Sequence, residues 1–290
     1  MKGVGETTAA ITIVNALPAG IGAAVGIELP VRAEVELHPA GSHGRWDVAL
    51  PEDARSPLVL EALTESLRRF APGSSGTGAL TIHSEIPPAR GLKSSSAVSV
   101  AIALAVARAT DAPIDPLEIA RLSAGVSRTA GVSATGALDD ALASLSAGVV
   151  VTDNRSETVL TRYALPDGLG VALYVAPGIH RPAPELLPAF RGESATGRRA
   201  GDLATHGDWA GAMRTNTELV ERVIGYDYAG LRTRLDASGA VASGVSGLGP
   251  AFAVIGPRDR LSALLEVLPA ANGSRRIVSF SARHLPTEAS

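Results

Sequence analysis

Apolar residues alternate with polar ones along some segments of the chain and recur with helical spacing along others. In segment 31–38, VRAEVELH, every second residue is apolar, which predicts a strand with one buried face. In segment 57–70 a stripe of apolar residues falls every three or four positions, which predicts a helix, and Ser56 and Pro57 are typical of its first turn. The run 97–107 is apolar almost throughout, so we expect a helix packed on most of its sides.

The same patterns predict further strands and helices. Short apolar or alternating runs indicate strands at 9–14, 79–86 and 170–177, and Asp115 and Asp208 are typical helix caps. Glycine-rich runs between these elements are expected to be turns or loops, namely 15–26 and 71–78.

Strands and helices alternate irregularly, and several of the strands have one polar face. This favours an α+β fold over a doubly wound parallel sheet. The composition changes near 154–157, where we place a boundary between an N-terminal domain, 1–155, and a C-terminal domain, 156–290. In the second part, 240–256 predicts strand, glycine turn and strand, whereas 181–199, rich in Arg, Pro and Gly, is expected to be a mobile connection.

Composition narrows the class of protein. With 290 residues, 46% of them hydrophobic, the chain is long enough for one large or two modest domains with real cores. A net charge of −3 and 3% aromatic residues argue against nucleic acid as a partner. Cysteine is absent, which excludes disulfides, thiolate metal sites and a cysteine nucleophile. We expect no signal peptide and no membrane-spanning run, and therefore a cytoplasmic protein with no membrane partner.

The stretch 85–97, EIPPARGLKSSSA, gathers Gly91, Lys93 and three serines in front of the apolar run. It fails as a Walker A loop, in which lysine directly follows glycine, and as a serine–lysine hydrolase motif, in which the lysine follows the serine. A phosphate cradle fits better, because the first N–H groups of a helix lack partners and carry the positive end of the helix dipole. The alternative is that Ser94 or Ser95 only caps the helix.

Two later stretches have both a structural and a functional interpretation. Segment 135–145, TGALDDALASL, places Asp139 and Asp140 after a glycine turn, where one acid can cap a helix and leave the other free for chemistry. Segment 243–251, SGVSGLGPA, is either a plain hairpin turn or a place where the backbone closely approaches a ligand.

Together these stretches resemble the GHMP kinase superfamily, whose signature P-x-x-x-G-L-x-S-S-A is matched from Pro87 to Ala97 with one extra serine. The form GLKSSSA, with TIVNALPAGIGAAVG near the start, is similar to the archaeal-type shikimate kinases, and the likeness covers nearly the whole length. It implies an N-terminal domain like domain 2 of ribosomal protein S5, a ferredoxin-like C-terminal domain, and ATP in the cleft between them. It also implies phosphorylation of the 3-hydroxyl of shikimate, in aromatic amino-acid biosynthesis.

The resemblance further implies roles for individual residues. Catalysis is assigned to Asp139, with Asp140 as the alternative acid, and to Lys93, while Mg²⁺ is assigned to Ser95 and Ser96. ATP is assigned to one continuous run: Pro87, Pro88, Ala89, Arg90, Gly91, Leu92, Lys93, Ser94, Ser95, Ser96 and Ala97. The substrate is assigned to a scattered set: Asn15, Asp139, Ser246, Gly247 and Gly249.

Two features depart from the superfamily's pattern. Between residues 125 and 137 there is no acid to match the glutamate with which many members ligate magnesium, and the first motif lacks the lysine of mevalonate kinases. The carboxylate of shikimate needs a cation, and the possible ones are Arg128, Arg181 with its neighbour His180, and Arg191. The alternatives are another small-molecule kinase of the superfamily, for homoserine or mevalonate, and an inactive ligand-binding member. The oligomeric state stays open.

Overall fold

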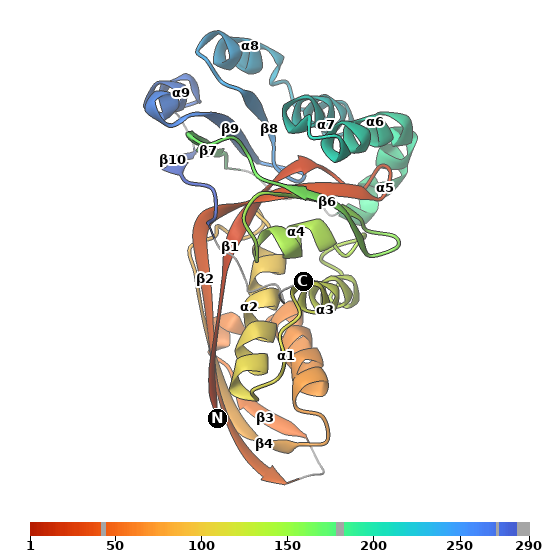
Figure 1. Cartoon of the computed structure of the whole chain (residues 1–290), viewed down its shortest axis with the longest axis vertical. Coiled ribbons are helices and arrows are strands. Elements are labelled where there is room, and N and C mark those ends of the chain that lie inside the picture. Colours follow the sequence, from red (N-terminus) through yellow and green to blue (C-terminus); the bar gives the residue numbers. More distant parts are fainter. Residues whose placement is uncertain (42–44, 178–182, 271–272, 283–290) are drawn as a thin grey trace.

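The computed structural model describes residues 1–41, 45–177, 183–270 and 273–282, and within them the strands form two sheets. Figure 1 shows a long lower part built on the first sheet and a smaller upper part built on the second. One continuous cluster of buried apolar side chains extends from the first sheet and its helices into the second sheet, so the two parts share a core.

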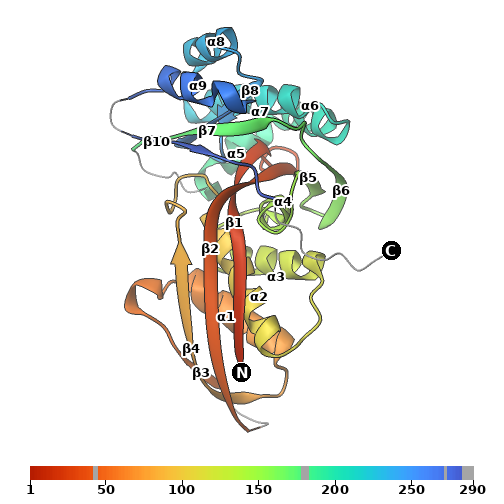
Figure 2. The same cartoon turned by 60° about the vertical axis from the view of Figure 1, so that its left-hand side comes forward.

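Two long antiparallel strands, β1 (Lys2–Val14) and β2 (Ile21–Gly41), organise the first sheet. On the side of β2 away from β1, its beginning pairs with β5 (Val149–Asp153) and its end pairs with β4 (Ser75–Ser84). The outer strands are β3 (Trp46–Ala49) and β6 (Thr158–Tyr163). Figure 2 shows β1 and β2 running from the lower part up to the second sheet.

The described residues of the lower part form four α-helices (Figure 1): α1 (Pro57–Phe70), α2 (Ser94–Ala109), α3 (Pro116–Thr129) and α4 (Leu138–Ala143). Helices α2 and α4 contact the first sheet, and α1 and α3 pack against α2. Helix α2 lies directly on β1, where a Cβ on Gly5 would lie 1.8 Å from the carbonyl oxygen of Ala101. Glycine is therefore required for the helix and strand backbones to approach this closely. Almost every residue of α2 is buried, as its apolar composition predicts.

The second sheet has the strand order β10-β7-β9-β8. Its strands are β7 (Leu169–Val175), β8 (Ala242–Val245), β9 (Ala251–Pro257) and β10 (Ser274–Val278). Its helices are α5 (Ala183–Gly192), α6 (Ser194–Thr205), α7 (Trp209–Ile224), α8 (Ala229–Ala237) and α9 (Leu261–Val267). Helical connections follow the first and third strands, and this order is that of a ferredoxin-like fold, as the resemblance implies. Within the described ranges no helix is long and apolar enough to cross a membrane.

The predicted helix starts are confirmed where a side chain caps the helix. Ser56 accepts a hydrogen bond from the N–H of the third helical residue of α1 at 3.3 Å. Asp208 accepts the N–H of the third residue of α7, and Asp115 accepts that of the second residue of α3, each at 2.9 Å. These starts depend only on neighbouring residues, so the local pattern suffices to predict them.

Three expectations about loops are wrong. The turn expected over 15–26 ends early because β2 begins at Ile21, and the loop expected over 71–78 ends at Ser75, where β4 begins. Inside β2, Gly22 permits a close contact rather than a turn: a Cβ on it would lie 2.5 Å from the Asp139 carboxyl group. The described part of 181–199 is helical in α5 and α6 rather than a connection.

The change from one sheet to the other lies later than the proposed domain boundary. Strand β6 pairs with β5 in the first sheet, and the second sheet begins with β7. The division at 155/156 therefore falls inside the β5–β6 hairpin, and we keep two domains as a proposal with the change of sheet between Tyr163 and Leu169.

Candidate active site

A cleft of about 960 Å³ collects segments that are far apart in the sequence. Its lining includes the end of β1 and the following turn, 14–17, and the loop and first turn of α2, 88–95. It also includes segment 131–135 with the start of α4, and Gly247 between β8 and β9. The fold therefore brings all the motifs that the sequence singles out to one place.

The first turn of α2 faces this cleft without a cap. The residue before the helix is Lys93, whose backbone is left-handed with φ 63°, and no side chain accepts a hydrogen bond from the first turn. The interpretation that Ser94 or Ser95 only caps the helix is therefore wrong, and both residues line the cleft instead. Unpartnered N–H groups at the positive end of a helix form a site for an anion.

At Gly91 the loop before α2 packs closely against the turn between β8 and β9. Its φ is 81°, and a Cβ would lie 2.1 Å from the carbonyl oxygen of Ser246, so only glycine fits. The Ser246 hydroxyl donates to the Gly91 carbonyl at 2.7 Å and accepts the N–H of Thr12 at 3.1 Å. The N–H of Gly247 donates to the Thr12 hydroxyl at 2.8 Å. Segment 243–251 is therefore hydrogen-bonded to β1 and to the loop before α2, so it is more than a hairpin turn.

The two adjacent acids at the start of α4 are both buried, with exposed fractions of 4% for Asp139 and 6% for Asp140. Lys93 Nζ lies 3.1 Å from Asp140 Oδ2. Asn154 donates to Asp139 Oδ1 at 3.0 Å and accepts the first N–H of α4 at 2.6 Å. Neither acid caps the helix, because both lie inside α4 and its first N–H donates to Asn154. The two carboxyl groups therefore have different partners: a cation for Asp140 and a neutral amide for Asp139.

Burial controls the protonation of this pair. Burial, and then the charge of Asp140, raises the pKa of Asp139 to about 7, against the lowering effects of Lys93 and Asn154. Burial also raises the pKa of Asp140, although Lys93 acts in the opposite direction. Asp139 can therefore take up or release a proton near neutral pH, which is the property that a general base requires.

Most of the predicted site residues reach the cleft. Those that line it are Asn15, Pro88, Ala89, Arg90, Gly91, Leu92, Lys93, Ser94, Ser95, Asp139, Asp140 and Gly247. Ser96 and Ala97 are buried behind its surface, with exposed fractions of 2% and 0%. Gly249 faces Tyr226, where a Cβ would lie 2.7 Å from the hydroxyl, so it shapes the turn. Pro87, which is also predicted to bind ATP, precedes the lining segment 88–95 and does not itself line the cleft.

The residues present fit a magnesium ion that arrives with a nucleotide. No cluster of three or more His, Cys, Asp or Glu that could hold a metal occurs in the described residues. Mg²⁺ on a nucleotide needs only one or two protein ligands, because phosphate oxygens and water supply the others. Asp140 Oδ1 is buried without a hydrogen-bond partner among the described residues, and Ser95 lines the same cleft. Ser96 is the less suitable hydroxyl, since it is buried.

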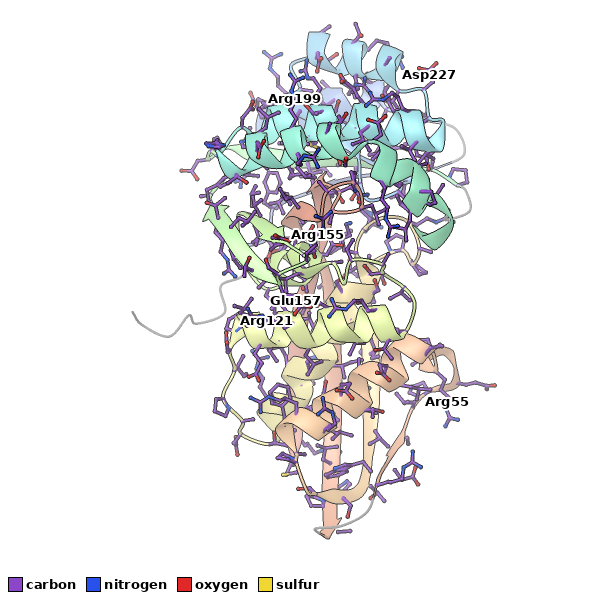
Figure 3. All side chains as sticks on the ribbon, turned by 90° about the vertical axis from the view of Figure 1, so that its right-hand side faces the viewer. Arg55, Arg121, Arg155, Glu157, Arg199 and Asp227 are labelled. Atoms are coloured by element: carbon purple, nitrogen blue, oxygen red, sulfur yellow. The ribbon has the colours of Figure 1, made fainter. Side chains whose placement is uncertain are left out.

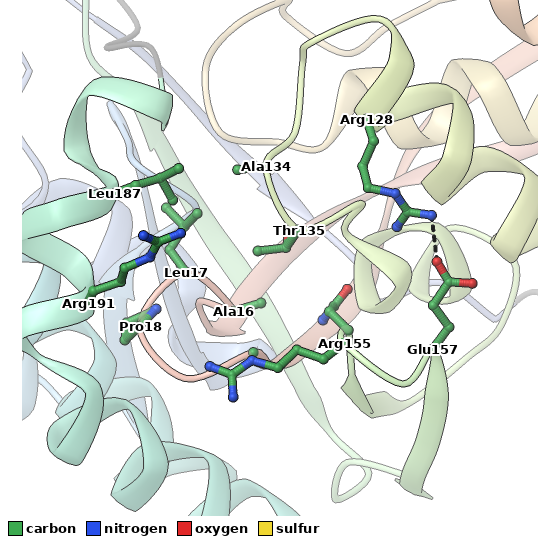
Figure 4. A pocket seen from close by; sticks show the side chains of 12 residues that line it. Ala16, Leu17, Pro18, Arg128, Ala134, Thr135, Arg155, Glu157, Leu187 and Arg191 are labelled. Carbon is green, nitrogen blue, oxygen red and sulfur yellow. Dashed lines mark hydrogen bonds and ion pairs between the residues drawn. The ribbon is translucent and has the colours of Figure 1, made fainter.

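A second cavity, of about 450 Å³ and drawn in Figure 4, adjoins the cleft. The two share four lining residues: Ala16, Leu17, Ala134 and Thr135. Arginines from three elements line the second cavity: Arg128 from α3, Arg155 from the β5–β6 turn and Arg191 from α5. It therefore gathers cations beside the acids of the cleft.

The structure tests the predicted cations in part. Arg128 and Arg191, which the sequence offers as partners for a carboxylate, line the second cavity, whereas His180 and Arg181 lie outside the described residues. The sequence analysis missed Asn154 and Arg155. Neither belongs to a recognisable motif, and the only signal there is the change of composition near 154–157.

Curated proteins resemble this chain over most of its length. Residues 57–148 match the sequence family described as GHMP kinases N terminal domain. The chain is 34% identical over 260 residues to the shikimate kinase of Pyrococcus abyssi, which covers 88% of this chain and 92% of that protein. It is 37% identical over 268 residues to the shikimate kinase of Aeropyrum pernix, with 90% and 92% covered.

Solved structures share the fold at lower identity. The mevalonate kinase of Methanococcus jannaschii superposes with a TM-score of 0.72 at 13% identity, over 96% of this chain and 98% of that one. A phosphotransferase related to the CoA biosynthesis pathway gives a TM-score of 0.73 at 17% identity, over 98% and 97%. At these identities the likeness concerns the fold alone, and it confirms the predicted α+β architecture.

Proposed function

The chain belongs to the archaeal-type shikimate kinases of the GHMP kinase superfamily, and from this premise we propose that it transfers the γ-phosphoryl group of ATP to the 3-hydroxyl of shikimate. The family makes the protein an ATP-dependent small-molecule kinase. The choice of shikimate is supported by relatives of that name that cover about nine-tenths of the chain. The observation that carries the proposal is a single cleft that holds the uncapped end of α2, Lys93 and Asp139.

The triphosphate of ATP fits against the first turn of α2. Phosphoryl transfer passes through a loose transition state, so the protein contributes mainly position and neutralised charge. The first turn has no side-chain cap and its Ser94 and Ser95 line the cleft, where the helix dipole favours an anion. Gly91 lets the loop backbone come close, and the Lys93 ammonium is near enough to share its charge between Asp140 and a phosphate.

Asp139 is the residue that we assign to the acceptor alcohol. As the O3–P bond forms and the bond from the γ-phosphorus to the β,γ-bridging oxygen breaks, the hydroxyl proton passes to the Asp139 carboxylate and ADP leaves. The Asn154 amide holds Asp139 Oδ1 at 3.0 Å and so keeps the carboxylate oriented. A pKa of about 7 makes Asp139 a base that is ionised in a large fraction of molecules at neutral pH.

Asp140 and Ser95 are the residues that we assign to Mg²⁺. When bound, Mg²⁺ supplies charge neutralisation at the phosphate oxygens. Asp140 Oδ1 is available for this, because only Oδ2 faces Lys93. A reaction that uses ATP as donor also agrees with the cytoplasmic location expected from the sequence.

Release of ADP, measured by a coupled assay with ATP, Mg²⁺ and a panel of acceptors, tests the proposal. We expect turnover with shikimate and little with homoserine or mevalonate, and product analysis should place the phosphate on the 3-hydroxyl. Turnover with homoserine or mevalonate but none with shikimate would overturn the assigned substrate. Binding of ATP away from α2, in a crystal structure with a nucleotide analogue, would overturn the assigned phosphate site.

A further inference from the structure

The second cavity is lined by an excess of positive charge. Its charged lining residues are three arginines and one glutamate. Arg128 is neutralised by Glu157, whose carboxylate lies 2.6 Å from the Arg128 guanidinium. Arg155 and Arg191 have no acidic partner within the part of the chain that the structure describes. Two unpaired guanidinium groups beside one small cavity favour an anionic ligand.

We propose that this cavity binds the carboxylate of the acceptor substrate, and that Arg155 and Arg191 are the residues that recognise it. The inference rests on the proposed function, which supplies a hydroxy acid as acceptor. The planar guanidinium group can bind a carboxylate through two parallel hydrogen bonds, so arginine selects a carboxylate by geometry as well as by charge.

The cavity lies at the right place for one end of such a substrate. Asn154 lines it and donates to Asp139 Oδ1, so the cavity begins where the proposed base is held. The cleft and the cavity are also continuous through their shared lining residues. Shikimate carries its 3-hydroxyl and its carboxylate on one small ring. A molecule with its hydroxyl at Asp139 therefore extends its carboxylate toward the arginines.

A phosphate of ATP is a less suitable occupant of the cavity. None of the loop and helix residues 88–95, which form the proposed phosphate site, lines it. The apolar lining suits the carbon ring of a small acid better than a polyphosphate chain, and it consists of Ala16, Leu17, Pro18, Ala134 and Leu187.

The backbone positions Arg155 for this task. The residue directly follows Asn154, whose N–H donates to the carbonyl oxygen of Gly20 at 2.8 Å. The Arg155 side chain lies against Gly20, where a Cβ would be 2.7 Å from Nε, so glycine leaves the space that the guanidinium stem occupies. One turn therefore holds both the amide that orients the base and the cation that we assign to the carboxylate.

Arg191 reaches the same cavity from the upper part of the molecule. Figure 4 shows Arg155 and Arg191 approaching the loop of Leu17 and Pro18 from opposite sides. Arg191 belongs to α5, which follows the first strand of the second sheet, whereas Arg155 follows a strand of the first. The carboxylate would thus be bound by both parts of the molecule at once.

Steady-state kinetics of Arg155→Gln, Arg191→Gln and the double variant test the proposal, with shikimate and its methyl ester as acceptors. Each single change should raise the KM for shikimate by about 10- to 100-fold, as expected for loss of a charged hydrogen bond. The KM for ATP should stay within about twofold. The unaltered enzyme should prefer the acid to the ester, and the double variant should lose most of that preference because the ester has no negative charge.

Arg199→Gln is the matched control, since Arg199 is an exposed arginine of α6 that does not line either cavity. Figure 3 shows Arg155 between the two parts of the molecule and Arg199 on the helices of the upper part. An unchanged KM and an unchanged acid-to-ester preference in both single variants would overturn the carboxylate assignment while kinase activity persists. If the unaltered enzyme phosphorylates a different hydroxy acid, the proposed function fails, and the same comparison with that acid and its ester still decides the role of the arginines.

Discussion

Two pairs of helices in this protein begin in different ways. Helices α3 and α7 begin at Asp115 and Asp208, whose side chains each accept an N–H of the first turn. Helices α2 and α4, which open onto the cleft, begin after Lys93 and Ala137 instead. Both of these residues have a left-handed backbone although neither is glycine, and neither provides a side-chain cap; the first N–H of α4 donates instead to the distant Asn154.

The difference shows where stability is given up for binding. A left-handed non-glycine residue costs about 1 kcal/mol, and a missing cap costs about as much again. Two neighbouring buried carboxyl groups at α4 add a further unfavourable interaction. In return, the first turn of the long helix α2 keeps its N–H groups available, and α4 presents Asp139 and Asp140 to the cleft. Helices α6, α8 and α9 also begin without a side-chain cap, so the distinctive feature of the two helix starts at the cleft is the left-handed residue before each.

The largest effect should come from Asp139→Asn. Asparagine keeps the size of the side chain and its contact with Asn154, but it cannot accept the hydroxyl proton. We expect turnover with shikimate to fall by about 10²- to 10⁴-fold while nucleotide affinity is kept. A coupled assay of ADP release measures turnover, and nucleotide titration measures affinity.

Asp115→Asn is the control for this substitution, because it makes the same chemical change at the start of α3. Asparagine can cap that helix as aspartate does. It should leave turnover unchanged. Turnover near that of the unaltered enzyme in Asp139→Asn would move the role of base to Asp140 or to another group.

The pH dependence should be the next largest effect. Because the pKa of Asp139 is raised to about 7, this group is protonated in acid, and kcat/KM for shikimate should fall about tenfold per pH unit below that value. Stability should move in the opposite direction. A raised folded-state pKa favours the native state below the unfolded value near 4, and that contribution is lost as pH rises through about 7. Asp139→Asn should therefore raise the free energy of unfolding by about 1 to 3 kcal/mol at pH 8. At pH 4 the substitution should leave it unchanged.

Much of the fold could be predicted because its signals are local. The caps of α3 and α7 and the alternation in β2 depend on neighbouring residues. The glycine-rich start of β2 was misread because Gly22 is required by a contact with Asp139, which no local pattern shows. Asn154 was missed for a similar reason, since its function depends on the same distant acid. Sequence motifs identify the residues of the proposed phosphate site and the two acids. The residues that orient those acids can be identified only from the three-dimensional structure.

Gly91→Ala should have an intermediate effect, because it disturbs the backbone at the cleft. A Cβ at this position would lie 2.1 Å from the Ser246 carbonyl oxygen, so the loop must move. We expect the KM for ATP to rise by about 10-fold or more. Gly73→Ala is the control: it has a similar φ of 71° but open space around it, so it should cost about 1 kcal/mol of stability and leave the KM for ATP unchanged.

The smallest effect should come from removing a cap far from the cleft. Asp115→Ala deletes the oxygen that accepts the N–H of Leu117 at 2.9 Å, and it should lower the free energy of unfolding by about 1 kcal/mol. Urea unfolding measures this loss, and Asp115→Asn should show much less of it. Neither substitution should change the KM for ATP or shikimate, because α3 is held by its own cap and its start does not line the cleft. If Asp115→Ala weakened ATP binding as much as Gly91→Ala does, helix starts would matter equally throughout the molecule, and the contrast between capped helices and those that face the cleft would be lost.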